Sequence, residues 1–73
     1  MKVNGIYRWK SFPTDLFVII YVNKSHISYE YISGPDKGKA FSEIKKSMEN
    51  IKHSFTYLGN SVKIAKILYG IDS

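Results

Sequence analysis

Apolar positions are most concentrated between Leu16 and Val22. This run of seven apolar residues contains only β-branched or aromatic side chains after Leu16. Such a run is typical of a central strand that is buried on both faces, because it offers no polar side to water. We therefore expect the rest of the chain to cover this segment.

The segments on either side of this run alternate between two kinds of side chain, as strands do. Val3 to Lys10 predicts a first strand with Tyr7 and Trp9 facing inward, and His26 to Ile32 predicts a third strand. A two-residue hairpin loop at Asn23 and Lys24 would pair Ile20 with Ile27.

This pairing predicts which face of the sheet is the core. The core side would carry four aliphatic residues of the central strand together with three residues of the third strand: Leu16, Val18, Ile20, Val22, Ile27, Tyr29 and Tyr31. The reverse side of the central strand would then expose an aromatic and apolar patch, with Trp9 nearby. Because such patches often mark interaction sites, the candidate partner-binding residues are Trp9, Phe17, Ile19 and Tyr21.

A helical spacing follows the third strand. Six apolar residues recur at intervals of three and four, namely Phe41, Ile44, Met48, Ile51, Phe55 and Leu58. This spacing predicts an amphipathic helix over residues 41–58 that covers the sheet and ends at Gly59. Residues 54–57 prefer strands, so a helix that ends near Lys52 and leads into a further strand through Leu58 is the alternative.

The last segment predicts a short helix over residues 62–69, capped by Asn60 or Ser61 and ended by Gly70. Its apolar side would consist of Ile64, Ile67, Leu68 and Ile71. Since the segment is apolar nearly all round, we expect it to pack deeply against the aromatic patch or a second subunit.

Together these elements predict an α+β fold in one domain, residues 1–73. A three-stranded antiparallel meander over residues 3–32 would be packed by the helix over 41–58 and followed by the helix over 62–69. The alternative is a small SH3-like barrel, in which Phe55 to Leu58 is a strand that helps to close the sheet.

Length and composition change this picture in two ways. A chain of 73 residues buries only about 60% of its unfolded surface, so self-association as a homodimer is expected. The chain has no cysteine, its N-terminal segment lacks the apolar core of a signal peptide, and its longest apolar run is too short for a membrane helix. We therefore expect a cytoplasmic protein with no membrane partner.

The net charge of +5 admits nucleic acid or an acidic protein as partner. Ten of the eleven basic residues are lysine, whereas base reading and bidentate phosphate contacts favour arginine, so protein is the stronger candidate. A nucleic-acid-binding surface would use Lys2, Arg8, Lys10, Lys37 and Lys39. The usage of lysine, isoleucine and serine is what AT-rich coding produces, as in many small accessory genes of phages and mobile elements.

Motifs for catalysis are not evident. His26, Ser28 and Glu30 share a strand face, but serine lies between the other two, and a working triad needs histidine in the middle. In residues 34–40, three residues separate the two glycines, and Ala40 follows the lysine. A nucleotide-binding loop needs four residues between these glycines and a serine or threonine after the lysine, so this segment does not match it. No metal-ligand spacing is present, and we expect no cofactor.

The sequence thus favours a non-catalytic protein-binding module, such as an inhibitor or adaptor of a phage or mobile element that docks on a host protein. The alternative is a nucleic-acid-binding protein that uses lysines for phosphates and exposed aromatic residues for base stacking.

Overall fold

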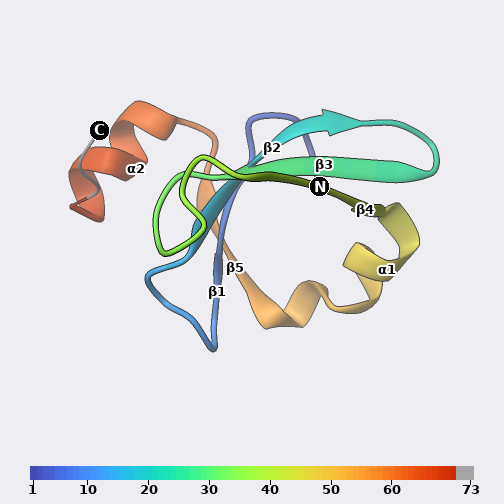
Figure 1. Cartoon of the computed structure of the whole chain (residues 1–73), viewed down its shortest axis with the longest axis horizontal. Helices are drawn as coiled ribbons and strands as arrows, with labels where there is room; N and C mark the ends of the chain where they lie inside the picture. Colours follow the sequence, from blue (N-terminus) through green and yellow to red (C-terminus); the bar gives the residue numbers. More distant parts are fainter. Residues whose placement is uncertain (71–73) are drawn as a thin grey trace.

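Five antiparallel strands form one sheet in the computed structural model of this chain, which describes residues 1–70 (Figure 1). The strands are β1 (Ile6–Trp9), β2 (Leu16–Val22), β3 (His26–Tyr31), β4 (Ala40–Ile44) and β5 (Phe55–Gly59), in the spatial order β4-β3-β2-β1-β5. The helices are α1 (Lys45–Asn50), the 3-10 turn η1 (Lys52–Ser54) and α2 (Val62–Leu68). The α+β class is confirmed, but the sheet is larger than the predicted meander because β4 and β5 join its two edges.

The helix predicted over residues 41–58 is wrong. Only Lys45–Asn50 is α-helical, while β4 precedes it and β5 follows it. Phe41, Phe55 and Tyr57 belong to residue types that favour strands, and within the described residues no side chain caps the start of α1. The helical spacing of six apolar residues therefore arose across three different elements.

The alternative fold is right about one strand and wrong about closure. Phe55–Gly59 forms β5 and pairs with β1, as the barrel reading expects of residues 55–58. The sheet does not close into a barrel, because β4 and β5 are its two edges rather than partners. In the chain, α1 and η1 connect these edges, and α1 places the buried Met48 in the core.

The register of the β2–β3 hairpin differs from the prediction. Val22 pairs with Ile27, and Ile19 pairs with Tyr29, but the register shifts between them so that Ile20 is an extra residue. A one-residue bulge exchanges the faces on which the side chains of a strand lie. Ile27 is fully buried while Ile20 is 45% exposed, so the predicted pairing of these two residues is wrong.

This bulge places Phe17 and Ile19 in the core. They share the first of two core clusters with Ile27, Tyr29, Tyr31, Met48 and Phe55. Phe17 is the centre of this aromatic cluster. Its ring centroid lies 4.9 Å from that of Tyr29 and 5.4 Å from that of Phe55. Such edge and tilted contacts add to the stabilisation by burial.

The opposite face of the sheet carries the second cluster, formed by Ile6, Leu16, Val18, Ile32 and Ala65. Both faces of β2 are therefore buried near its start, as the apolar run predicts. The helix α2 contributes Ala65 and the half-buried Val62 to this second cluster. It lies at one end of the long axis of the molecule, and α1 lies at the other end (Figure 1). Neither helix, nor any other within residues 1–70, has the length and apolar character needed to cross a membrane.

The α2 helix begins where the sequence predicts, but it packs with its other side. The side chain of Ser61 accepts a hydrogen bond from the Ile64 backbone N–H at 3.3 Å, which is a standard N-cap. Val62 and Ala65 face the sheet, while Ile64 and Ile67 point outward. Ile71, predicted on the packed side, lies outside the described residues. Ala65 is 2% exposed within the second cluster, so a larger side chain at this position has no free space.

Candidate protein-binding surfaces

The patch predicted from Trp9, Phe17, Ile19 and Tyr21 does not form as one surface. Phe17 and Ile19 are both 0% exposed, so they contact only the interior of the protein. Trp9 is half-buried in the first core cluster, and its indole Nε1 donates a hydrogen bond to the Tyr31 hydroxyl at 2.9 Å. The bulge is the physical reason for this correction, since it turns the aromatic side of β2 inward.

Tyr21 alone of these four residues is open to solvent, at 55% exposure. It lies opposite Ser28, whose hydroxyl contacts that of Ser42 on β4 at 3.2 Å. This part of the sheet face is mixed in polarity, with the exposed Ile20 and Ile44 beside it. It therefore retains one aromatic group of the predicted surface, with neighbours other than the predicted Phe17 and Ile19.

Three exposed aliphatic side chains lie together on α2. Ile64 is 56% exposed, Ile67 is 72% exposed and Leu68 is 67% exposed. The spacing i, i+3 and i+4 places them on one face of the helix. Exposed aliphatic residues gathered in this way mark interaction sites, whereas isolated ones do not.

Sequence reasoning named these three residues but assigned them to the interior. The signal that was available is the contrast in size along the helix. Val62 and Ala65 are the small residues, one turn apart, that fit against a sheet, and the larger residues occupy the other side. Because the side of the helix with the small residues is buried, the side with the large aliphatic residues is left on the surface.

The charges on α2 are of one sign. Lys63 and Lys66 flank the apolar residues, and the segment Val62–Leu68 contains no acidic residue. Just beyond the helix, the ring of Tyr69 lies over the guanidinium of Arg8, with 5.8 Å between the Arg8 Cζ and the ring centroid. This distance is within the range of a cation–π contact. The surface is therefore apolar with a basic surround.

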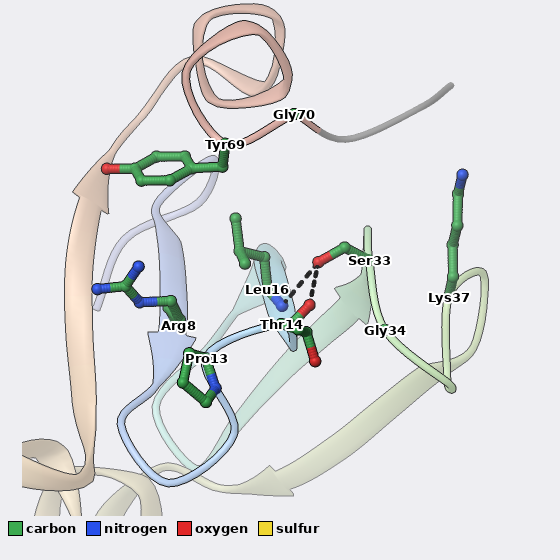
Figure 2. Close-up of a pocket in the computed structure, with 9 residues that line it drawn as sticks. All are labelled: Arg8, Pro13, Thr14, Leu16, Ser33, Gly34, Lys37, Tyr69 and Gly70. Atoms are coloured by element: carbon green, nitrogen blue, oxygen red, sulfur yellow. Dashed lines mark hydrogen bonds between the residues drawn. The ribbon is translucent and has the colours of Figure 1, made fainter.

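Arg8 and Tyr69 also line a pocket of about 440 Å³ between the loops that precede β2 and follow β3. The Ser33 hydroxyl donates to the Thr14 carbonyl at 2.6 Å and accepts from the Leu16 N–H at 3.1 Å, which ties these loops together. Figure 2 shows Arg8 and Lys37 on opposite sides of this pocket. Its two cationic groups do not converge on a common point, which a bound phosphate would require.

The other basic residues predicted for nucleic acid are dispersed. Lys2 lines a separate pocket of about 400 Å³ beside Tyr7 and Tyr57. Lys39 is 3.5 Å from the carboxylate of Asp36. Lys2 and Lys10 both lie outside the bounds of β1, the strand that carries Arg8.

Two tyrosines titrate abnormally because of where they are buried. Burial, with smaller contributions from Tyr31 and Glu43, raises the pKa of Tyr29 to about 12. Burial and then the neighbouring Tyr57 raise the pKa of Tyr7 above its ordinary value. In both cases burial disfavours the charged phenolate form.

Groups suited to catalysis or metal binding are scarce in the part of the chain that the structure describes. Residues 1–70 contain no cluster of three or more histidine, aspartate or glutamate side chains that could hold a metal ion. The Ser25 hydroxyl is 2.8 Å from Nδ1 of His26, but both residues are exposed in the β2–β3 turn. Asn23 organises this turn by accepting hydrogen bonds from the backbone N–H groups of both residues.

Comparison of the chain with protein-family models, with curated proteins and with solved structures found no match. The candidate surfaces therefore rest on the geometry of this chain.

Proposed function

We propose that this protein is a non-catalytic protein-binding module and that the outer face of α2 is its docking surface. The observation that carries the proposal is the exposure of Ile64, Ile67 and Leu68, each more than half open to solvent. Burying an aliphatic side chain of this size stabilises a complex by roughly 1.5–3 kcal/mol before the costs of association. Three such anchors on one short helix suit docking into an apolar groove.

The partner that fits this face is a protein whose apolar groove has an acidic rim. Lys63 and Lys66 border the aliphatic residues, and the chain carries a net charge of +5. Acidic groups at the rim would speed association and select the orientation of binding. An inhibitor or adaptor in the cytoplasm, as in a phage or mobile element, remains part of this proposal.

Nucleic acid is the second candidate, and the geometry supports it less well. A phosphate-binding surface needs basic groups in a continuous row or groove. Arg8 stacks on Tyr69, Lys39 is next to Asp36, and Lys2 lies at a different pocket. These separate positions favour protein over nucleic acid.

Site-specific photo-crosslinking tests the proposal. A photoreactive phenylalanine at position 67, in nuclease-treated extract of the producing cell, should form an adduct with one protein through a segment that contains apolar and acidic residues. The same probe at Phe12, a loop residue that is 61% exposed, is the matched control and should not form this adduct. Equal labelling from both positions, or an adduct that forms only in extract not treated with nuclease, would contradict the proposal.

A substitution then tests the anchors directly. The double variant Ile64→Ser, Ile67→Ser should lose capture of the crosslinked protein by at least about tenfold, because each position removes an apolar anchor. Phe12→Ser should retain it. Retention of the partner by the double variant, with an unchanged circular dichroism spectrum, would eliminate α2 as the docking surface.

A further inference from the structure

The β4 strand is an open edge of the sheet. Among the strands of residues 1–70, it pairs with β3 alone, and its five pairs follow one another without interruption. All five of its residues are exposed. The other edge strand, β5, differs because its register with β1 shifts and it ends in a glycine. Proteins usually protect edges with bulges, proline or charged side chains. β4 has neither a bulge nor a proline, and its one charged residue, Glu43, lies between the flanking Lys39 and Lys45.

The hydrogen bonds of β4 show which of its backbone groups are directed away from β3. The Tyr31 N–H donates to the Lys39 carbonyl at 3.0 Å, and the Lys45 N–H donates to the Ser25 carbonyl at 2.9 Å. Residues of an antiparallel ladder alternate between bonding one neighbour and bonding the other. The odd-numbered residues therefore bond β3, and Ala40, Ser42 and Ile44 direct their N–H and C=O groups outward.

We propose that this edge pairs with β4 of a second copy of the chain, antiparallel, with Phe41 on the two-fold axis. Ala40 then lies opposite Ser42 of the second copy, and Ser42 lies opposite its Ala40. Both members of each pair direct their backbone groups outward, so each pair exchanges its N–H···O bonds as an antiparallel ladder requires. An isologous contact of this kind closes as a dimer.

Side-chain charge selects this register. It places Lys39 opposite Glu43 of the second copy. The two-fold axis also places Glu43 opposite Lys39 of the second copy, so the interface has two pairs of opposite charges. The present partner of Lys39 is Asp36 at 3.5 Å, with both side chains substantially exposed. An exposed pair of this type contributes little, so it does not hold Lys39 away from the new contact.

The neighbouring registers are worse. With Ala40 on the axis, Phe41 meets Lys39, and Glu43 meets Lys37, which lies outside β4. With Ser42 on the axis, Phe41 meets Glu43 and Lys39 meets Lys45. With Glu43 on the axis, two glutamates lie directly opposite each other, which destabilises a sheet. A further shift toward Ile44 is blocked because the chain enters α1 at Lys45. An axis between two residues would pair an outward-directed residue with one that already bonds β3.

Phe41 suits the central position. It is 40% exposed, and its ring centroid is 5.9 Å from that of Tyr29 and 5.7 Å from that of Tyr31. Residues on the axis form a non-hydrogen-bonded pair, in which side chains approach most closely. The two Phe41 rings would therefore contact each other across the interface, and each would still contact Tyr29 and Tyr31 of its own copy.

Sedimentation analysis with a charge exchange tests the dimer and its register. Because the interface is small, we expect weak, reversible dimerisation that is detectable when the protein concentration is raised to about 1 mM. Lys39→Glu and Glu43→Lys should each weaken it by about tenfold, because each creates two like-charge pairs. The double variant should recover dimerisation, since it exchanges the charges. A wild-type chain that stays monomeric at about 1 mM overturns the proposal, as does a double variant no better than the single ones.

Disulfide trapping provides an independent measurement, because the chain has no cysteine. Phe41→Cys places two thiols across the axis, where the Cβ atoms of a directly opposed pair lie about 4.5–5.5 Å apart. It should form a covalent dimer under mild oxidation. The control Ser42→Cys faces Ala40 of the second copy and should form it at least about tenfold more slowly. Equal rates would overturn the register. Neither variant alters α2, so failure here is distinguishable from failure of the α2 docking surface.

Discussion

The indole Nε1 of Trp9 donates a hydrogen bond to the Tyr31 hydroxyl at 2.9 Å, although their strands are not neighbours in the sheet. Trp9 lies at the end of β1 and Tyr31 at the end of β3, with β2 between them. Both rings contact Phe17, at centroid distances of 6.1 and 5.7 Å. The bond therefore passes over β2 and fixes three strands to one another.

Removing the acceptor of this bond should destabilise the protein. Tyr31→Phe leaves the half-buried indole N–H without its partner, and we expect a loss of about 1–3 kcal/mol in the free energy of unfolding. Urea denaturation followed by the fluorescence of the single tryptophan measures it. Tyr57→Phe, at a ring that is 57% exposed, should change the free energy by less than about 0.5 kcal/mol. Equal losses in both variants would show that the hydrogen bond contributes nothing specific.

Deleting Ile20 should preserve the fold. Ile20 is the extra residue of the bulge, so its removal leaves Ile19 opposite Tyr29 and Tyr21 opposite Ser28 in a regular ladder. We expect a cooperative thermal transition and an unchanged near-ultraviolet circular dichroism spectrum, because the aromatic core keeps its members.

The matched control for this deletion is removal of Val18. That change moves Leu16 and Phe17 by one position, which exchanges their faces and places each in the wrong core cluster. We expect this variant to lose cooperative unfolding. If the variant without Val18 folds and the variant without Ile20 does not, Ile20 is not the extra residue of the bulge.

The orientation of α2 can be tested at its two sides. Ala65→Leu adds volume where the helix meets the sheet at 2% exposure, so it should cost about 1–3 kcal/mol. Ile67→Ala removes as many carbon atoms as Ala65→Leu adds, but at 72% exposure, and should cost less than about 0.5 kcal/mol. Urea denaturation of both variants measures these values. The reverse order would mean that the helix packs with Ile67 inward.

Alkaline pH should destabilise the fold through Tyr29. Its pKa is about 12 in the folded protein and has the ordinary value of 10.0 when the chain is unfolded. Between these values the unfolded chain releases a proton that the folded protein keeps, so the free energy of unfolding is full below pH 10 and decreases as pH rises toward 12. Tyr29→Phe should show a smaller decrease over this range in urea denaturation. An identical pH profile in the variant would rule out Tyr29 as a source.

The sequence predicted the first three strands and the last helix because their patterns are local. Strict alternation in residues 26–32 and the cap at Ser61 correspond directly to β3 and to the start of α2. The number of strands was underestimated, since the apolar residues from Phe41 to Leu58 also match a helix. Strand preference at residues 55–57 was the local signal that favoured β5.

The binding surfaces were harder to predict because they depend on faces rather than on elements. One bulge at Ile20 decides which side of β2 is buried, and it leaves no mark in an unbroken apolar run. Likewise, the choice between the two apolar sides of α2 depends on the sheet against which Ala65 fits. Both decisions come from tertiary packing, which hydrophobic periodicity does not encode.

The α2 helix packs into the second core cluster with residues of β1, β2 and β5, at a distance in strand order from β4. A dimer that forms through β4 would leave the α2 helix of each copy uncovered, so the dimer would present two equivalent docking faces. A bivalent molecule of this kind gains avidity toward a partner that is itself repeated or oligomeric, without any new contact. If both proposals hold, the separation of edge and helix would let two copies of this very small chain bridge two targets.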